Sequence, residues 1–187
     1  MSNITNTWEP IGNTIVNYAI NKNAEPVIGF LLRNDDNRVT KVIAYVGRYE
    51  PTGGNILYGI ELTYEDSKRS IRVGSRGESS KSLSLEHGEK ISHMVIRATD
   101  RVDGMDVKTD RGQHFTVGGN GGEHHEQNTG NGLLLGFHGT YKYGQLWSMG
   151  GIFRRSSEGK FSGLGTFPMK WSYNLHDGFS DISQDDI

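Results

Sequence analysis

The sequence predicts an all-β protein, and three observations lead to that fold class. Apolar and polar residues alternate with a period of two along most of the chain, and no window of about 11 to 18 residues sustains a helical stripe. The 187 residues include 26 glycines but only 4 prolines, which is typical of many tight turns. A four-strand unit also recurs along the chain. Together these features indicate several small antiparallel sheets.

The candidate strands are short and are separated by clusters of Gly, Asn, Asp and Ser, a spacing typical of a sandwich, barrel or prism. In chain order they are Thr14–Ile20, Val27–Leu32, Val39–Val46, Leu57–Tyr64, Ser70–Val73, Ser82–Leu85, Ile91–Ala98, Met105–Lys108, His114–Val117, Leu133–Phe137, Trp147–Phe153 and Phe161–Leu164. No long linker divides them. We therefore expect one domain over residues 1–172, followed by an acidic C-terminal tail at residues 173–187 without a calcium-loop motif.

Three segments, beginning near residues 42, 94 and 133, align as copies of one unit. Each contains an apolar strand, a polar loop, a strand opened by glycine, a charged turn, another strand and a glycine-rich loop. The aligned glycines lie 45 and 47 residues apart: Gly59, Gly104 and Gly151. Three such sheets around a pseudo-threefold axis would cover one another's apolar faces, and strands from residues 14–32 would complete the third sheet.

Composition excludes several classes of function. The 20 Lys and Arg residues against 22 Asp and Glu give a net charge of −2, so no electrostatic case exists for a nucleic-acid partner or an anionic membrane. The absence of cysteine excludes disulfides, thiolate metal sites and a cysteine nucleophile. No apolar run is long enough for a membrane insertion, and no signal peptide is recognisable. A cytoplasmic or non-classically secreted protein is expected.

Two motifs are similar to those of a known family. RVDGMDVKTDRGQHFTVGGNGG, from Arg101, resembles that family's strand, turn and strand followed by a GG loop, and NGLLLGFHG, from Asn131, resembles its penultimate strand. On these motifs, the stretch from about Val39 to Phe153 resembles the jacalin-related lectins. The resemblance implies a β-prism I fold, with three four-stranded Greek-key sheets and pseudo-threefold symmetry. It also implies a non-catalytic, metal-independent lectin that needs no cofactor.

Residues 99–103 (TDRVD) look like the family's sugar loop, and residues 118–122 (GGNGG) look like the glycine loop that faces it. The resemblance implies that Asp103 accepts hydrogen bonds from two sugar hydroxyls, while backbone N–H groups of neighbouring residues donate. A carboxylate flanked by donors matches vicinal hydroxyls well. The alternative is that both segments are simply tight turns. The predicted carbohydrate-binding residues are Asp100, Arg101, Val102, Asp103, Gly121, Gly122 and Glu123.

The third copy carries Trp147 where the family has its aspartate. Tyr141, Tyr143 and Trp147 are therefore predicted as a second sugar contact through stacking, with the alternative that Trp147 is core and the tyrosines cover a prism end. His124 and His125 are interpreted as part of a solvated loop, although either could line the sugar pocket. No metal site is predicted, because adjacent residues on a strand point to opposite faces.

A glycosidase would need two paired carboxylates, for which Asp103 and Glu123 are the candidates. A shallow glycine-lined loop exposes both groups to water, so an enzyme is not predicted. The glycine loop is internal to the chain, which by the resemblance implies mannose/glucose-type glycans rather than galactosides. The expected partners are glycans or glycoproteins. The protein is expected to bind them as a homo-oligomer, namely a dimer. The alternative is a β-prism protein-interaction or toxin-targeting module without sugar binding.

Overall fold

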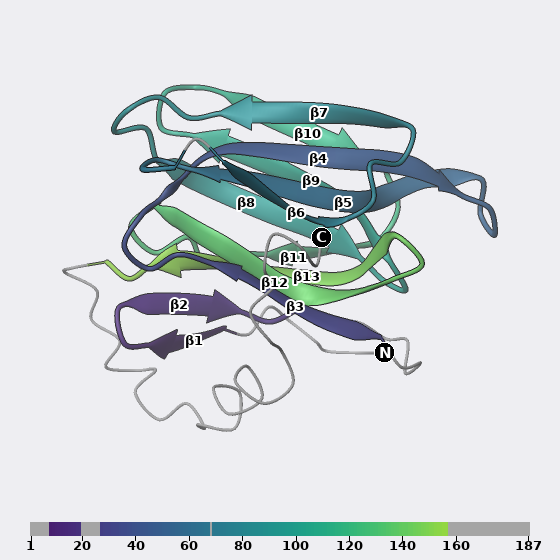
Figure 1. Cartoon of the computed structure of the whole chain (residues 1–187), viewed down its shortest axis with the longest axis horizontal. Coiled ribbons are helices and arrows are strands. Elements are labelled where there is room, and N and C mark those ends of the chain that lie inside the picture. The colour runs from purple at the N-terminus through teal and green to yellow at the C-terminus, as the bar shows by residue number, and fades with distance from the viewer. Residues whose placement is uncertain (1–7, 20–26, 68, 157–187) are drawn as a thin grey trace.

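The computed structural model describes residues 8–19, 27–67 and 69–156 of the chain (Figure 1). These residues form thirteen β-strands and no helix, which confirms the predicted all-β class. The strands make three antiparallel sheets that lie against one another as the sides of a prism (Figure 1). No helix that could cross a membrane occurs in this part of the chain. The predicted strand Phe161–Leu164 and the acidic tail lie outside the described residues.

The first two sheets are copies of one Greek-key unit. The first contains β4 (Val39–Tyr49), β5 (Gly54–Tyr64), β6 (Ser70–Gly74) and β7 (Ser79–Ser84), in the spatial order β6-β5-β4-β7. The second contains β8 (Ile91–Ala98), β9 (Val102–Thr109), β10 (His114–Gly118) and β11 (Glu123–Glu126), in the equivalent order β10-β9-β8-β11. The predicted repeat is therefore a repeat of sheet topology.

The third sheet is completed by N-terminal strands, as predicted. It contains β1 (Trp8–Ile11), β2 (Thr14–Asn17), β3 (Ile28–Arg33), β12 (Leu134–Lys142) and β13 (Gln145–Arg154), in the order β1-β2-β13-β12-β3. The strand β1 is a fifth member that the prediction of four-stranded sheets omitted. It is short and contains Pro10, and a sheet edge is where a strand with proline is tolerated.

The segment that contains His124 and His125 is not the solvated loop that the sequence indicated. It forms β11, which pairs with β8 through Glu123 opposite Ala98 and His125 opposite Ile96. The His125 side chain is buried, and its Nε2 lies 3.1 Å from the carbonyl oxygen of Ala98. EHHE lacks the apolar residues that mark a strand, so the backbone pairing offered by β8 decides its conformation.

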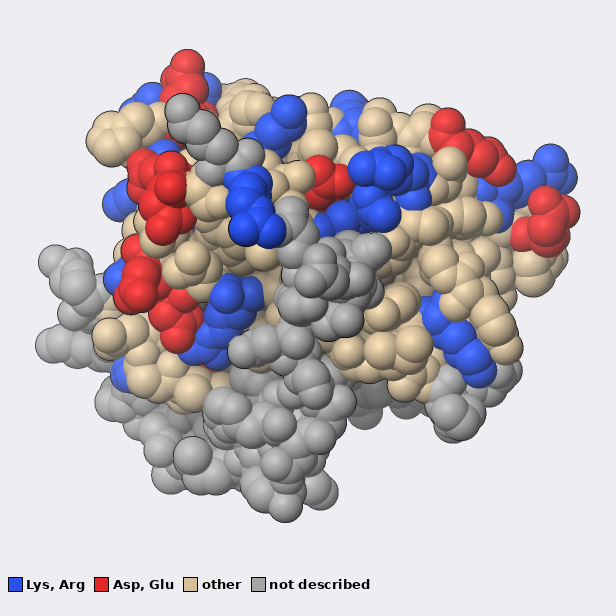
Figure 2. All heavy atoms as spheres, in the orientation of Figure 1, with Lys and Arg blue, Asp and Glu red and all other residues tan. Residues whose placement is uncertain are grey.

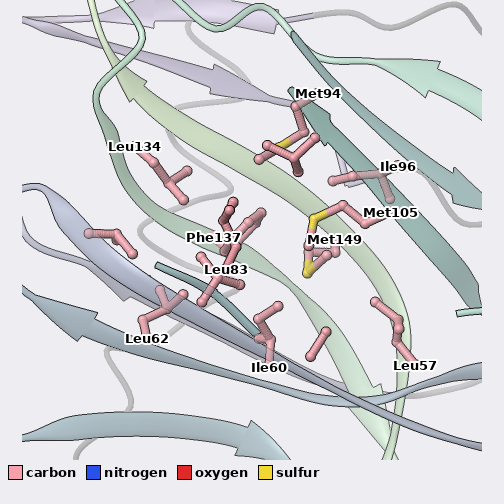
Figure 3. Packing of buried hydrophobic residues seen from close by; sticks show 14 of the residues in the cluster. Leu57, Ile60, Leu62, Leu83, Met94, Ile96, Met105, Leu134, Phe137 and Met149 are labelled. Atoms are coloured by element: carbon pink, nitrogen blue, oxygen red, sulfur yellow. The ribbon is translucent and has the colours of Figure 1, made fainter. Parts of the chain in front are cut away.

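The core lies between the three sheets. Alternate side chains of each strand point inward, and those of β5, β8, β9, β12 and β13 meet along the prism axis (Figure 3). Figure 3 shows Ile60 and Leu62 of the first sheet facing Met105 of the second and Phe137 of the third. Each sheet therefore buries its apolar face only when the other two are present.

His138 of β12 is a buried polar group that makes stability depend on pH. Its Nε2 donates to the carbonyl oxygen of Asn17 at 2.6 Å, and burial lowers its pKa from 6.5 to about 4. Between pH 6.5 and about 4, His138 therefore binds a proton in the unfolded chain but not in the folded protein. The free energy of unfolding consequently falls as the pH drops below about 6.5.

We expect His138 to lower the free energy of unfolding by about 2–3 kcal/mol between pH 7 and pH 4.5, as measured by urea unfolding. His138→Gln retains a side-chain donor but does not titrate, so its stability should depend less steeply on pH over this range. The exposed His124, changed in the same way, is the control. Equal slopes for the parent protein and His138→Gln would contradict the assignment.

Candidate functional site

Each sheet contains a β-bulge at the same place in its central hairpin. In the second sheet Arg97 pairs with Gly104 and Ala98 pairs with Val102, so Asp103 is the extra residue between them. The equivalent irregularities in the other sheets leave Tyr58 and Trp147 as the extra residues. The register therefore places Trp147 at the position that corresponds to Asp103, as the sequence comparison predicted.

The same register corrects one part of the repeat alignment. The residue after the bulge is Gly59 in the first sheet, Gly104 in the second and Ser148 in the third. Gly151 lies further along β13, opposite Phe137, and is not the counterpart of the other two glycines. The aligned glycine of the third copy was therefore displaced by three residues.

The glycine loop after β10 packs directly on the carboxylate of Asp103. A Cβ atom at Gly121 would lie 3.2 Å from Oδ1 of Asp103, and one at Gly122 would lie 2.5 Å from Oδ2. Gly122 also has a φ of 91°, which L side chains rarely adopt. Glycine is therefore needed at both positions, because any side chain there would displace the carboxylate of Asp103.

The Asp103 side chain is partly buried, and its carboxylate is incompletely hydrogen-bonded. Its Oδ2 is buried and has no hydrogen-bond partner among the described residues. Burial is the largest influence on its pKa and, with the negative charge of Asp100, raises it above 3.8, although the guanidinium of Arg97 and the backbone N–H of Thr99 act in the opposite direction. A buried acceptor without a donor costs stability, and groups perturbed in this way cluster at functional sites.

Arg97 of β8 lies beside this carboxylate, and the sequence analysis missed it. Its guanidinium donates from Nε to Oδ2 of Asp106 at 3.0 Å and from Nη2 to the carbonyl oxygen of Val117 at 3.2 Å. It fills the space over Gly104, where a Cβ atom would lie 2.5 Å from Nη2. Only 4% of Arg97 is exposed, so it is a buried positive charge next to the candidate site.

The structure brings the two predicted sugar-binding segments to one end of the second sheet. Asp100 and Arg101 lie in the loop between β8 and β9, and Val102 begins β9 as a buried residue. Glu123 begins β11 directly opposite Ala98, at the base of that loop, and is exposed. Their roles in sugar binding, including donation by the backbone N–H groups of residues 101, 102 and 122, stay predictions.

The three aromatic residues of the third copy do not share a surface. Trp147 is 1% exposed and lies under the guanidinium of Arg101, whose Cζ is 3.5 Å from the ring centre. Tyr141 packs against the core, with its ring centre 6.3 Å from that of Phe30. Tyr143 alone is well exposed. This geometry favours the interior interpretation of Trp147 that the sequence left open.

The described residues contain no group of three or more His, Cys, Asp or Glu side chains arranged to hold a metal ion. What the fold and the site define together is a β-prism with a carboxylate and a glycine loop at one end. The Jacalin-like lectin domain family matches residues 35–152, and the chain belongs to this family of non-catalytic, carbohydrate-binding proteins. No curated protein gives a significant match.

Solved structures share this fold at low sequence identity. A lamprey immune protein superposes with a TM-score of 0.66 at 19% identity, over 78% of this chain and 46% of its own, so this chain spans less than half of that protein. The Calsepa lectin in complex with a biantennary N-glycan gives 0.56 at 18% identity, over 75% and 96% of the two chains. AcmJRL, a mannose-binding jacalin-related lectin from Ananas comosus, gives 0.51 at 14% identity, over 70% and 96%.

Proposed function

We propose that this protein binds mannose- or glucose-type glycans at Asp103, without a metal ion. The observation that carries the proposal is the partly buried Asp103 carboxylate, whose Oδ2 lacks a hydrogen-bond partner among the described residues and faces Gly122. Oδ2 lies beneath the glycine loop, so a sugar hydroxyl would reach it only when that loop moves aside, and its donation would then provide the missing hydrogen bond. Such a charge-assisted bond is roughly twice as strong as a neutral one.

The preference for mannose and glucose rests on which hydroxyls could reach the carboxylate. In both sugars the equatorial 4-hydroxyl and the 6-hydroxyl can donate to one carboxylate together. The facing loop, residues 118–122, is internal to the chain. It therefore offers backbone N–H groups to a sugar, but no free terminal amino group that could contact galactose. Two of the similar structures support this choice, because one is described as a mannose-binding lectin and the other holds an N-glycan.

A homo-oligomer, with a dimer as its smallest form, is part of the proposal. Among the three bulge positions of the described residues, only Asp103 is a carboxylate, since the others are Tyr58 and Trp147. One shallow site per chain gives weak binding to a single sugar. Joining two chains raises the avidity for a branched glycan without new contacts.

A glycan array followed by competitive elution tests this function. The folded protein should retain mannose- or glucose-terminated glycans, and methyl α-mannoside should elute it from a mannan column where methyl α-galactoside does not. Elution by the galactoside alone would contradict the specificity. A folded protein that binds nothing on the array would instead favour a β-prism module that contacts proteins and not sugars.

A further inference from the structure

Hairpins from all three sheets meet at one end of the prism. Arg101, in the loop between β8 and β9, reaches out of the second sheet and places its guanidinium 3.5 Å from the ring centre of Trp147 in the third. The same guanidinium lies 5.2 Å from the ring centre of Tyr49, at the end of β4 in the first sheet. The hairpins β4–β5 and β12–β13 reach this end together at the right of Figure 1.

Arg101 retains hydrogen-bonding capacity at this end. Its Nε donates to Oε1 of Gln145 at 3.2 Å, and its Nη1 donates to the carbonyl oxygen of Asp100 at 3.0 Å. A guanidinium has five N–H donors, and the others have no partner among the described residues. No carboxylate in this part of the chain forms an ion pair with Arg101.

A second cation belongs to the same cluster. The Nζ atom of Lys142 lies 6.0 Å from the ring centre of Trp147 and 4.9 Å from the ring centre of Tyr143. Lys142 and Arg101 thus both lie within 6.0 Å of one indole ring. In the view of Figure 2 basic and acidic side chains lie in separate small groups with other residues between them, so this face carries no continuous basic surface. The cation pair is a local feature of the hairpins.

Tyr143 has a backbone conformation that is unusual for a tyrosine. Tyr143 and Gly144 form a two-residue turn between the paired Lys142 and Gln145, with φ values of 55° and 69°. Such a turn strongly prefers asparagine, aspartate or glycine at its first position, because other side chains are strained there. Tyr143 is also 77% exposed, so packing does not compensate for the strain. Strain that is retained without packing is characteristic of a functional position.

We propose that Arg101, Lys142 and Tyr143 form a second binding site, for glycans that carry an anionic group. The exposed ring of Tyr143 would stack on the pyranose, and the free edge of the Arg101 guanidinium would bind a carboxylate or sulfate in a bidentate manner, with Lys142 adding charge. This chemistry is opposite to that of Asp103, whose carboxylate repels such a ligand. The proposal therefore does not rest on the mannoside site, although both sites use the loop that carries Arg101.

Isothermal titration of the whole folded chain tests the proposal with three probes: sialyllactose for the carboxylate, a heparin-derived tetrasaccharide for the sulfate, and neutral lactose. At least one acidic probe should bind, more weakly as salt is raised, and lactose should not compete. Arg101→Gln should weaken acidic binding by about tenfold or more, as expected for loss of a charged hydrogen-bonding group. Arg69→Gln, at the opposite end of the first sheet between β5 and β6, makes the same charge change and should have no effect.

Two further variants separate the second site from the first. Tyr143→Asn should raise the melting temperature, because asparagine suits the turn, while it weakens acidic binding. Lys142→Gln should weaken binding of the acidic glycans and leave mannoside binding unchanged. Asp103→Asn should weaken mannoside binding and leave binding of the acidic glycans unchanged. Failure of both acidic probes to bind the parent protein, or equal binding by the Arg101→Gln and Arg69→Gln variants, would overturn the proposal whatever happens at Asp103.

Discussion

Asp103→Asn is expected to weaken glycan binding by about tenfold to a hundredfold while the protein stays folded. Asparagine preserves the shape of the bulge and fits against Gly121 and Gly122 as aspartate does, but it replaces a charged double acceptor by one acceptor and an NH₂ group. Hydrogen bonds to charged groups contribute about 1.5–3 kcal/mol against about 1 for neutral ones, and each 1.4 kcal/mol is a factor of ten. Calorimetric titration with the best glycan from an array measures the loss.

Stability should move in the opposite direction from affinity. The pKa of Asp103 is raised on folding, so the folded protein binds this proton more tightly than the unfolded chain does. The carboxylate therefore lowers the free energy of unfolding as the pH rises from 3.8 through the raised pKa, and at pH 7 this cost is fully present. Asp103→Asn removes the charge, so its melting temperature at pH 7 should equal or exceed that of the parent protein.

The matched control is Asp66→Asn, in the turn between β5 and β6 at the opposite end of the first sheet. It makes the same chemical change on an exposed carboxylate and should leave glycan affinity unaltered. If Asp103→Asn binds glycan as well as the parent protein does, the carboxylate is not the sugar ligand. The unsatisfied Oδ2 would then need a structural explanation.

The fold was largely predictable because its determinants repeat along the chain. Period-two alternation sets the inward and outward faces of each strand, and three copies of one hairpin pattern set the number of sheets. The strands that escaped prediction, β1 and β11, are short and lack an apolar pattern. The conformation of β11 comes from pairing with β8, which is distant in sequence, and local propensity carries no signal for such pairing. The strand β1 pairs only with its neighbour β2, at the edge of the third sheet.

The candidate site was predictable only in its local parts. Asp103 and the glycine loop are recognisable because both belong to one hairpin unit, and a tight turn needs glycine whatever surrounds it. Arg97 was missed because an outward-facing arginine on a strand is ordinarily solvated, and its burial depends on Gly104 opening the space that it fills. The stack of Arg101 on Trp147 joins two sheets, so it follows from tertiary packing and not from spacing.

Trp147→Ala is expected to be the most destabilising single change at this end of the prism. Trp147 is 1% exposed, and removal of a buried tryptophan ring typically costs about 3–5 kcal/mol through lost burial and the cavity left behind. The guanidinium of Arg101 would also lose the ring on which it lies, which adds roughly 0.5–2 kcal/mol. Urea unfolding at pH 7 measures the total.

Trp147→Phe separates packing from sugar binding, because phenylalanine keeps an aromatic ring beneath Arg101. It should cost roughly half as much stability as Trp147→Ala and leave mannoside affinity at Asp103 unchanged. A double-mutant cycle of Trp147→Ala with Arg101→Met removes the contact from both sides, and we expect a coupling of roughly 0.5–2 kcal/mol. Should Trp147→Phe remain fully stable but lose mannoside binding, while Asp103→Asn keeps it, the mannoside site belongs to the third sheet and the assignment to Asp103 is wrong.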